Sequence, residues 1–509
     1  MADPLLLHGA RSLVGAPERS WILIEEGRIA GMGRPGHEPR AARPVDVDGA
    51  VLGPAYCDAH VHLGATGLLA AGVDLTAVAT VDEVLARLAA VPPGRAELFG
   101  HGFDDPLDRP LSARDIDGVV GDRAVLLAQA DLHTCVVSSK ILHALDLADL
   151  EGVERSEEVP TGRLSERAAG AAFRWFDAHL SPATQVEALE AAAQLAYGRG
   201  IAEVHEMFVP EWRDEGGLDL SLSTVEPLAL RVVSYVALDD VRPVAERGLV
   251  QVGGDWFLDG SFGSHTAWLM EPYSDLPSDE ASRGMEYRTD DEVMHLFSAA
   301  QSGGLQVAVH AIGDAAIDQA LRIWERIAAR DGIAKIRALR HRIEHFEVAN
   351  DLAFRRAARL GLGLCVQPAF DLMWGGPEGL YSKRIGWDRA RVMNRFASMV
   401  KAGLNVGVGS DSIVTPMDPN LQMASLRDHH VPEERLDAET AHRLHTSGAF
   451  GLAPGADRLA GTLTLGAPGH LVALDRDPLT ASTVELRATE VLGTWIGGMR
   501  VWPPHLREE

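Results

Sequence analysis

Eight apolar segments of strand length recur between residues 55 and 412, and amphipathic helical stretches separate most of them. Near-continuous apolar runs are typical of strands in a parallel sheet that helices cover on both faces. Eight such units favour an α/β fold of the (β/α)8 TIM-barrel type. The expected barrel strands are residues 55–63, 201–209, 230–238, 254–262, 305–313, 341–348, 361–368 and 404–412.

The two ends of the chain look different, because short alternating apolar and polar runs lie there between glycine-rich turns. Chain termini often lie close together, so we expect residues 1–54 and 455–509 to form one small β-sandwich domain. The barrel then takes residues 55–94 and 176–454. Residues 95–175 contain strand and helix candidates of their own and exceed what one crossover needs, which predicts an inserted lobe.

The charge balance excludes some classes of partner. The 73 acidic residues outnumber the 47 lysines and arginines, which gives a net charge of −26. Such a chain repels phosphate backbones and anionic lipids, so we expect neither nucleic-acid nor membrane binding. The N-terminal residues lack the pattern of a secretory signal, and the three cysteines are scattered without metal-site spacing. We therefore expect a cytoplasmic protein, with a homodimer as the default oligomer.

Histidines and an aspartate lie at the ends of several expected strands. His60 and His62 are two residues apart, so their side chains point to the same face of the first strand. His310, His345 and Asp411 close the fifth, sixth and eighth strands. Each of these side chains, taken alone, is also compatible with a structural role in which it makes its own hydrogen bond in the core. Five of them at the carboxyl ends of barrel strands, where catalytic residues collect, favour a metal site.

These residues lie within longer strings that resemble the metal-dependent amidohydrolase superfamily, and within it the amidohydrolase family 3 (YtcJ-like) branch. The resemblance extends over nearly the whole chain and implies a (β/α)8 barrel, a β-sandwich formed by both termini and an inserted lobe after the first barrel strand. The matching strings are VLGPAYCDAHVHLG, LDGSFGSHTAWLMEPYSD, VHAIGDAAIDQAL, RHRIEHFEV, VQPAFD, VGSDS and LTLGAPGHLVALDRDPL.

The resemblance also implies roles for the strand-end residues. His60, His62 and His310 would bind a divalent metal ion, and Asp411 would contact the metal and accept a proton from its water. His345 would bind a second metal ion or polarise the substrate carbonyl. Neutral imidazoles and a carboxylate suit Zn²⁺, which makes hydroxide available near neutral pH.

One position departs from the family pattern. Many members have a carboxylated lysine on the fourth strand that bridges two metal ions, four residues before the aspartate of the DGS motif. Here that aspartate is Asp259, and position 255 is Asp255. Two alternatives stay open: a single zinc ion, which we favour because an aspartate is short, or a second metal ion with Asp255 or Glu206 as its carboxylate ligand.

Three further residues are candidates for substrate contact. His133 matches a family position near the pocket, His265 replaces the arginine of the family motif DGSxGSRTA, and Arg342 could hold an anionic group. Each is equally compatible with a structural role in its loop or at the barrel rim.

The function expected from these features is hydrolysis of a non-peptide C–N bond in a small molecule, such as an N-acyl or N-formyl amide or a cyclic amide, by metal-activated water. Two alternatives remain. The chain could deaminate an amino-substituted heterocycle, or it could be a catalytically silent relative that keeps the barrel for binding or assembly.

Overall fold

A computed structural model describes residues 3–41, 43–76, 78–92, 94–103, 107–129, 134–148, 150–209, 215–277, 279 and 281–503. The chain divides into two compact units. Unit 1 comprises Met1–His62, Gln194–Phe208 and Leu228–Glu509, and unit 2 comprises Leu63–Ala193 and Val209–Pro227.

Parallel strands form the centre of unit 1. One sheet has the strand order β15-β14-β7, and another has the strand order β16-β17-β18-β19-β20. A parallel bridge between Val61 and Ser412 joins β7 to the segment that follows β20. These strands are β7 (Tyr56–Val61), β14 (Ile201–Phe208), β15 (Arg231–Val236), β16 (Gln251–Phe257), β17 (Gln306–Ala311), β18 (Arg342–His345), β19 (Gly363–Val366) and β20 (Asn405–Val408).

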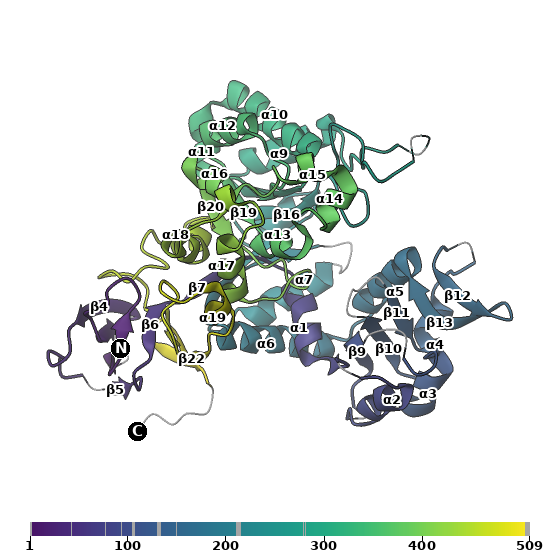
Figure 1. Cartoon of the computed structure of the whole chain (residues 1–509), viewed down its shortest axis with the longest axis horizontal. Helices are drawn as coiled ribbons and strands as arrows, with labels where there is room; N and C mark the ends of the chain where they lie inside the picture. Colours follow the sequence, from purple (N-terminus) through teal and green to yellow (C-terminus); the bar gives the residue numbers. More distant parts are fainter. Residues whose placement is uncertain are drawn as a thin grey trace. The chain divides into compact units, whose positions relative to one another are not determined.

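Helices lie between successive strands of this set along the chain. Figure 1 shows α9 (Asp290–Ser302), α10 (Asp314–Asp331) and α12 (Asp351–Leu360) beside one another. Local sequence sets their ends, because Thr289 and Glu292 form a capping box before α9 and Gly361 ends α12 in the left-handed conformation. The shorter elements are α8 (Arg242–Glu246), α11 (Ile333–Leu339), α13 (Pro368–Trp374), α14 (Leu380–Ile385), α15 (Trp387–Ala390), α16 (Phe396–Lys401), α17 (Pro419–Arg427), η1 (Pro432–Glu434), α18 (Ala438–Arg443), η2 (Leu444–Gly448) and α19 (Thr483–Arg487).

The fourth strand differs from the prediction. We expected residues 254–262, whereas β16 runs from Gln251 to Phe257. The sequence misleads here because Gly253 and Gly254 resemble a turn, and both have a positive φ, of 86° and 84°. They lie instead inside the strand, where the register with β17 shifts between Gly253 and Phe257. The backbone therefore bulges just before Asp255.

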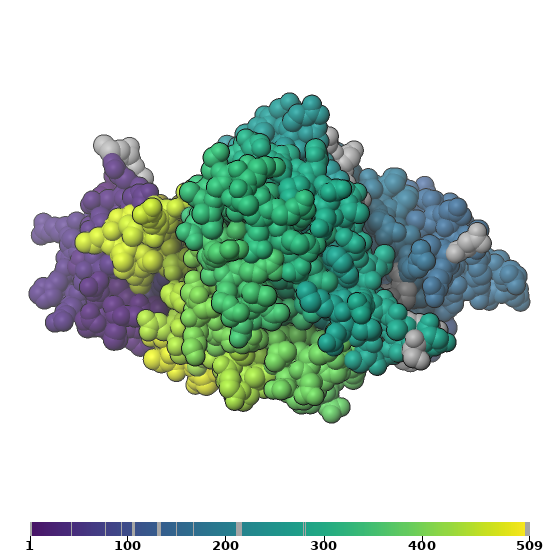
Figure 2. Space-filling view, turned by 90° about the horizontal axis from the view of Figure 1, so that it is seen from above, coloured from purple at the N-terminus to yellow at the C-terminus, as the bar shows by residue number. Residues whose placement is uncertain are grey.

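Both ends of the chain contribute to one sheet of unit 1. Its order is β2-β6-β21-β22-β23, and β6 pairs antiparallel with β21, so that Leu471 lies opposite Pro54. A second sheet, β4-β3-β1-β5, shares a buried core with it that includes Leu7, Ile24 and Trp495. Figures 1 and 2 show the purple and yellow segments side by side. The strands are β1 (Leu5–His8), β2 (Ser12–Leu13), β3 (Trp21–Glu25), β4 (Arg28–Gly33), β5 (Arg43–Asp46), β6 (Val51–Pro54), β21 (Leu471–Leu474), β22 (Val491–Ile496) and β23 (Met499–Trp502).

Unit 2 is built around a sheet with the order β12-β13-β11-β10-β9-β8. Its boundaries are wider than those of the expected lobe, so the finer division of the chain into three domains stays a prediction. No helix in the described part of the chain combines the length and apolar character that a membrane crossing requires. The elements are α1 (Leu63–Ala71), β8 (Val73–Asp74), α2 (Val81–Ala89), β9 (Glu97–Phe103), α3 (Ala113–Val120), β10 (Ala124–Gln129), β11 (Thr134–Val137), α4 (Ser139–Ala144), β12 (Val153–Ser156), β13 (Val159–Ser165), α5 (Glu166–Ala178) and α7 (Glu215–Val225), while α6 (Pro182–Gly198) extends into unit 1.

Candidate metal centre

The two histidines of the first strand present the same ring nitrogen to one point. His60 is fully buried, and its Nδ1–H donates to Glu344 Oε2 at 2.8 Å. His62 donates its Nδ1–H to the carbonyl of Met207 at 3.1 Å. Because each Nδ1 carries the proton for its acceptor, Nε2 is the nitrogen through which either neutral ring can bind a metal ion.

Strained backbone at two strand ends places further ligands. His345 and Asp411 have φ values of 67° and 54°, in the left-handed region that is unfavourable for residues other than glycine. Such strain concentrates at functional sites. The His345 Nδ1–H donates to Gln367 Oε1 at 2.9 Å, and its ring stacks on Phe370 with a centroid distance of 6.1 Å. Nε2 of His345 makes no hydrogen bond within the described residues, and the ring lies 5.0 Å from that of His60 between centroids.

Asp255 lies in the middle of the centre. Its Oδ2 is 3.2 Å from His62 Nε2, and its Oδ1 is 3.7 Å from His60 Nε2 and 3.8 Å from His310 Nδ1. His310 donates its Nε2–H to the carbonyl of Gly260 at 3.3 Å, so that Nδ1 is its free ligand atom. The bulge in β16 thus brings a short carboxylate to both histidine pairs.

The donor atoms meet closely enough for one or two ions. Among the groups in the described residues whose ligand atoms lie within 4.8 Å of one another, three consist only of these histidines and aspartates. Buried atoms of four members, His60 Nε2, Asp255 Oδ1, His345 Nε2 and Asp411 Oδ1, make no hydrogen bond there. Buried polar atoms without partners are rare, and a cation among these atoms would satisfy all of them. The groups are His60–His345–Asp411, His60–His62–Asp255 and Asp255–His310–His345.

The electrostatics also indicate a place for positive charge. Burial lowers the pKa of His62, but Asp411 and Asp255 outweigh it and raise the pKa to about 9. For His60, burial is likewise outweighed by Asp255 and Asp411, and its pKa lies above the ordinary value. Burial would raise the pKa of Asp255, yet the neighbouring histidines hold it below its usual range. The two carboxylates thus favour positive charge at the centre, which is what a bound cation would supply.

The structure brings together His60, His62, His310, His345, Asp411 and Asp255, and the other candidates that it describes belong to none of these ligand groups. Glu206, at the end of β14, is buried and raises the pKa of His62, but none of the ligand groups in the described residues includes it. His265 lies on a loop with its Nε2 3.0 Å from Asp275 Oδ2. Arg342 is fully buried inside the strands. His133 lies outside the described residues.

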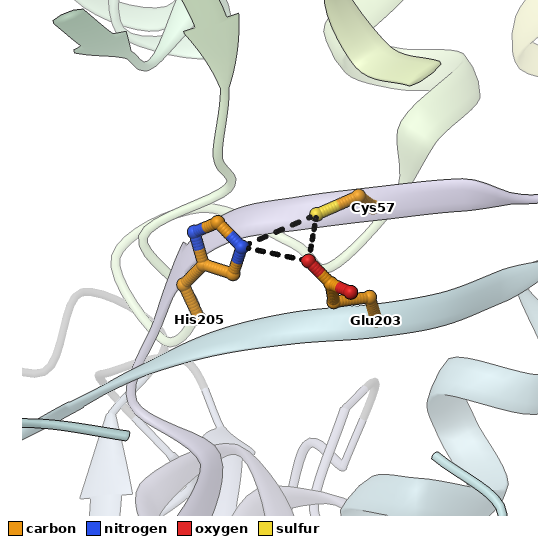
Figure 3. Close-up of side chains that lie close together, drawn as sticks. All are labelled: Cys57, Glu203 and His205. Carbon is orange, nitrogen blue, oxygen red and sulfur yellow. Dashed lines mark hydrogen bonds and ion pairs between the residues drawn. The ribbon is translucent and has the colours of Figure 1, made fainter. Parts of the chain in front are cut away.

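A further cluster, Cys57, Glu203 and His205, has ligand-like spacing but unsuitable chemistry (Figure 3). His205 Nε2 is 3.7 Å from Cys57 Sγ and 3.1 Å from Glu203 Oε1. However, Arg342 Nη1 donates to His205 Nδ1 at 2.8 Å, and a guanidinium cannot accept a hydrogen bond. The proton of neutral His205 is therefore on Nε2, where it donates to Glu203 and blocks a metal ion.

Two carboxylates that support the metal centre were not assigned to it from the sequence. Glu344 holds His60, and Asp259 accepts the backbone N–H groups of Trp268, Ile312 and Gly313 at 2.8–3.0 Å. The signal for Glu344 was the spacing of Arg342 and Glu344, since opposite charges two residues apart on a buried strand share a face and need each other.

Comparison with known proteins agrees with this geometry. A sequence model of the amidohydrolase family matches residues 43–502. The chain belongs to the amidohydrolase family. Among its relatives, the Bacillus subtilis (strain 168) protein YtcJ, named as an amidohydrolase, is 27% identical, with 94% of this chain and 95% of YtcJ aligned. The N-substituted formamide deformylase of Arthrobacter pascens is 25% identical, with 94% of each chain aligned.

A solved structure extends the amidohydrolase comparison to three dimensions. An uncharacterized metal-dependent hydrolase from Pyrococcus furiosus superimposes with a TM-score of 0.78 and 26% identity, over 94% of this chain and all of that one. The expected resemblance to YtcJ-like amidohydrolases is thereby confirmed, and the α/β fold is of the TIM-barrel type.

Proposed function

We propose that this chain is a metal-dependent hydrolase that cleaves a non-peptide C–N bond of a small molecule, such as an N-acyl or N-formyl amide or a cyclic amide. The observation that carries the proposal is the meeting of four histidines and two aspartates, four of which, His60, His345, Asp255 and Asp411, have a buried polar atom without a hydrogen bond in the described residues. The formamide deformylase among its relatives supports an amide as the substrate class.

A divalent ion bound here, with zinc as our choice, would supply an activated water and polarise the substrate carbonyl. His60 and His62 would hold it through Nε2, together with Asp411. His310 through Nδ1 and His345 through Nε2 would form the other half of the centre. Asp255 lies against three of the four histidines. We therefore extend the single-ion expectation to a two-ion centre, in which Asp255 would be the carboxylate ligand at the position of the family's lysine.

Asp411 is the proposed proton shuttle. Its Oδ1 lies 3.3 Å from His62 Nε2 and has no hydrogen bond within the described residues. A carboxylate so placed can accept a proton from water and deliver it to the departing nitrogen. His345 is rigid, because Gln367 and Phe370 hold its ring, and its buried Nε2 is suited to bind an ion or to face the oxyanion.

The same proposal covers the finer features of the fold. The eight parallel strands would close into a barrel, with the strand ends that carry the ligands at one rim. The two terminal sheets would form a β-sandwich, and residues 95–175 would form the inserted lobe. His133 and His265 remain proposed substrate contacts.

Metal analysis coupled to a substrate screen tests the function. Purified protein should contain divalent metal, and formamides, other small amides or cyclic amides should release the corresponding amine and carboxylate. Asp411→Asn should keep the melting temperature yet lose activity by roughly 100- to 10,000-fold, the usual range for a lost acid–base group. Ammonia release from amino-heterocycles would identify a deaminase instead. A metal-free protein that takes up no added zinc or manganese would contradict the proposal.

A further inference from the structure

Glu344 connects the metal centre to a chain of buried polar groups. Its Oε2 accepts the Nδ1–H of His60 at 2.8 Å, on the side of that ring opposite to the free Nε2. Glu344 and Arg342 are both fully buried, two residues apart on β18, and so point to the same side. Arg342 donates to both carboxylate oxygens, from Nε and from Nη2, at 2.6 Å each. This two-point contact fixes the plane of the carboxylate.

Every N–H group of Arg342 has an acceptor. Besides the two bonds to Glu344, Nη2 donates to the carbonyl of Ala59 at 2.6 Å. Nη1 donates to His205 Nδ1 at 2.8 Å and faces Tyr235 Oη at 3.4 Å. A guanidinium has five N–H groups, and these contacts use all of them. Arg342 therefore has no donor left for a substrate, and its position is fixed from three strands.

The series of hydrogen-bonded polar groups continues from His205 toward the beginning of the strands. His205, with its proton on Nε2, donates to Glu203 Oε1 at 3.1 Å, and Glu203 Oε2 accepts from Arg231 Nη1 at 2.6 Å. Glu203 is buried, whereas the Arg231 side chain is about half exposed at 47%. Each buried carboxylate is thus paired with one arginine, Glu344 with Arg342 and Glu203 with Arg231. Each buried negative charge is therefore compensated by a guanidinium.

We infer that Glu344 and Arg342 are positioning residues for the metal centre: they fix the proton of His60 on Nδ1 and keep its Nε2 directed at the ion. This assignment replaces the substrate role considered for Arg342. It rests on the proposed function only in that His60 is a metal ligand. When the hydrogen-bond acceptor of the second ring nitrogen of a metal-bound histidine is lost, metal affinity typically falls by 10- to 100-fold.

Two variants test the inference. In Glu344→Gln, one carboxylate oxygen is replaced by an NH2 group, which cannot accept a hydrogen bond. In one orientation this NH2 group faces Nε of Arg342, and in the other it faces both Nη2 of Arg342 and Nδ1 of His60. Either orientation breaks the two-point contact between Arg342 and residue 344. The double variant R342M/E344M replaces the ion pair by apolar side chains and leaves neither charge buried alone. Glu434→Gln is the matched control, because Glu434 is also a buried carboxylate but bonds Ser398 away from the centre.

The measurement is zinc affinity of the full chain by competition with a chelator. We expect zinc affinity to fall 10- to 100-fold in E344Q and in R342M/E344M, and to stay within twofold of wild type in E434Q. Spectra of the zinc-loaded protein with ¹⁵N-labelled histidine give a second readout. Wild type should show a hydrogen-bonded Nδ1–H of His60, assigned by its loss in His60→Gln.

The outcomes separate the two proposals. If wild type takes up neither zinc nor manganese, the proposed function fails, and the positioning role of Glu344 and Arg342 fails with it. If wild type binds zinc but its spectrum has no Nδ1–H for His60, the inference fails whether or not the variants fold. Unchanged zinc affinity in folded E344Q and R342M/E344M would also overturn it while leaving the metal-dependent function intact.

Discussion

Asp255 shows how one side chain determines what the centre can hold. A carboxylate offers two oxygens, and both lie within 3.8 Å of histidine nitrogens from different strands. Asparagine has the same shape but only one acceptor oxygen and no charge. The difference between the two side chains therefore tests the number of ions without a change of volume.

We predict that wild type binds two zinc ions per chain and that Asp255→Asn binds at most one. The measurement is zinc content after dialysis, by atomic absorption. Asp371→Asn is the control, because Asp371 is a buried carboxylate that contacts His430 instead of the centre. A zinc content of one ion per chain in both wild type and D255N would contradict the two-ion centre and support the single-ion alternative.

His341 illustrates a buried histidine with a structural role. Its Nδ1 accepts the N–H of Val307 at 2.9 Å, its Nε2–H donates to Gln301 Oε1 at 2.8 Å, and its ring stacks on Trp324. Burial lowers its pKa from 6.5 to about 3. The folded state thus keeps this ring neutral over a pH range in which the unfolded chain takes up a proton.

This pKa shift gives His341 a pH-dependent effect on stability. The contribution is complete above pH 6.5 and is lost as the pH falls from 6.5 toward 3, at about 1.4 kcal/mol per pH unit. In urea titrations, wild type should lose about 2 kcal/mol more than His341→Asn between pH 6.5 and 5. His295→Asn, at an exposed histidine, should follow wild type. Parallel pH profiles for wild type and H341N would contradict a neutral buried His341.

At the level of elements, the bulge in β16 is what carries Asp255 into the centre. A Cβ atom at Gly254 would lie 2.6 Å from Met207 Sδ and 2.9 Å from Tyr235 Cβ, at a φ of 84°. Gly248 also has a positive φ, of 75°, but a Cβ there meets nothing within 4 Å. The pair separates the effect of backbone conformation from that of close packing.

Gly254→Ala should therefore lower the free energy of unfolding by roughly 1–3 kcal/mol more than Gly248→Ala, because only the first overpacks the strand. It should also weaken zinc binding, since relief of the contact moves Asp255. Urea titration and chelator competition measure the two effects. Equal losses of stability in both variants, with zinc affinity unchanged, would show that the bulge does not position Asp255.

Pattern and periodicity predicted the elements well where each strand was a simple apolar run. The run LQVAVHAIG contains β17, and His310 is the last residue but one of that strand, close to where a strand-end residue was expected. β16 was displaced, because paired glycines resemble a turn until the strand beside them is known. The bond between His60 and Glu344 joins residues 284 positions apart, so no local pattern could predict it. The position of Asp255 at the metal centre depends on the bulge in β16, which the sequence does not reveal.

On the scale of the whole molecule, every residue of the metal centre belongs to unit 1. Unit 2 has its own buried cores, one including Leu126 and Phe176 and another including Val84 and Leu127. A ligand that binds only the folded state raises stability by about 2.7 kcal/mol at a concentration 100 times its dissociation constant. This gain applies only to unfolding events that disrupt the centre.

Hydrogen exchange with and without zinc should therefore distinguish the units. In unit 1, amides of β17 and β18 that exchange only through unfolding should slow about 100-fold with zinc at that excess. Amides of β10 and β11 in unit 2 should keep their metal-free rates, because their opening leaves all of the zinc ligands in place. Equal slowing in β10 would mean that both units unfold in one step. Unchanged rates in β17 and β18 would mean that zinc does not bind where His310 and His345 meet.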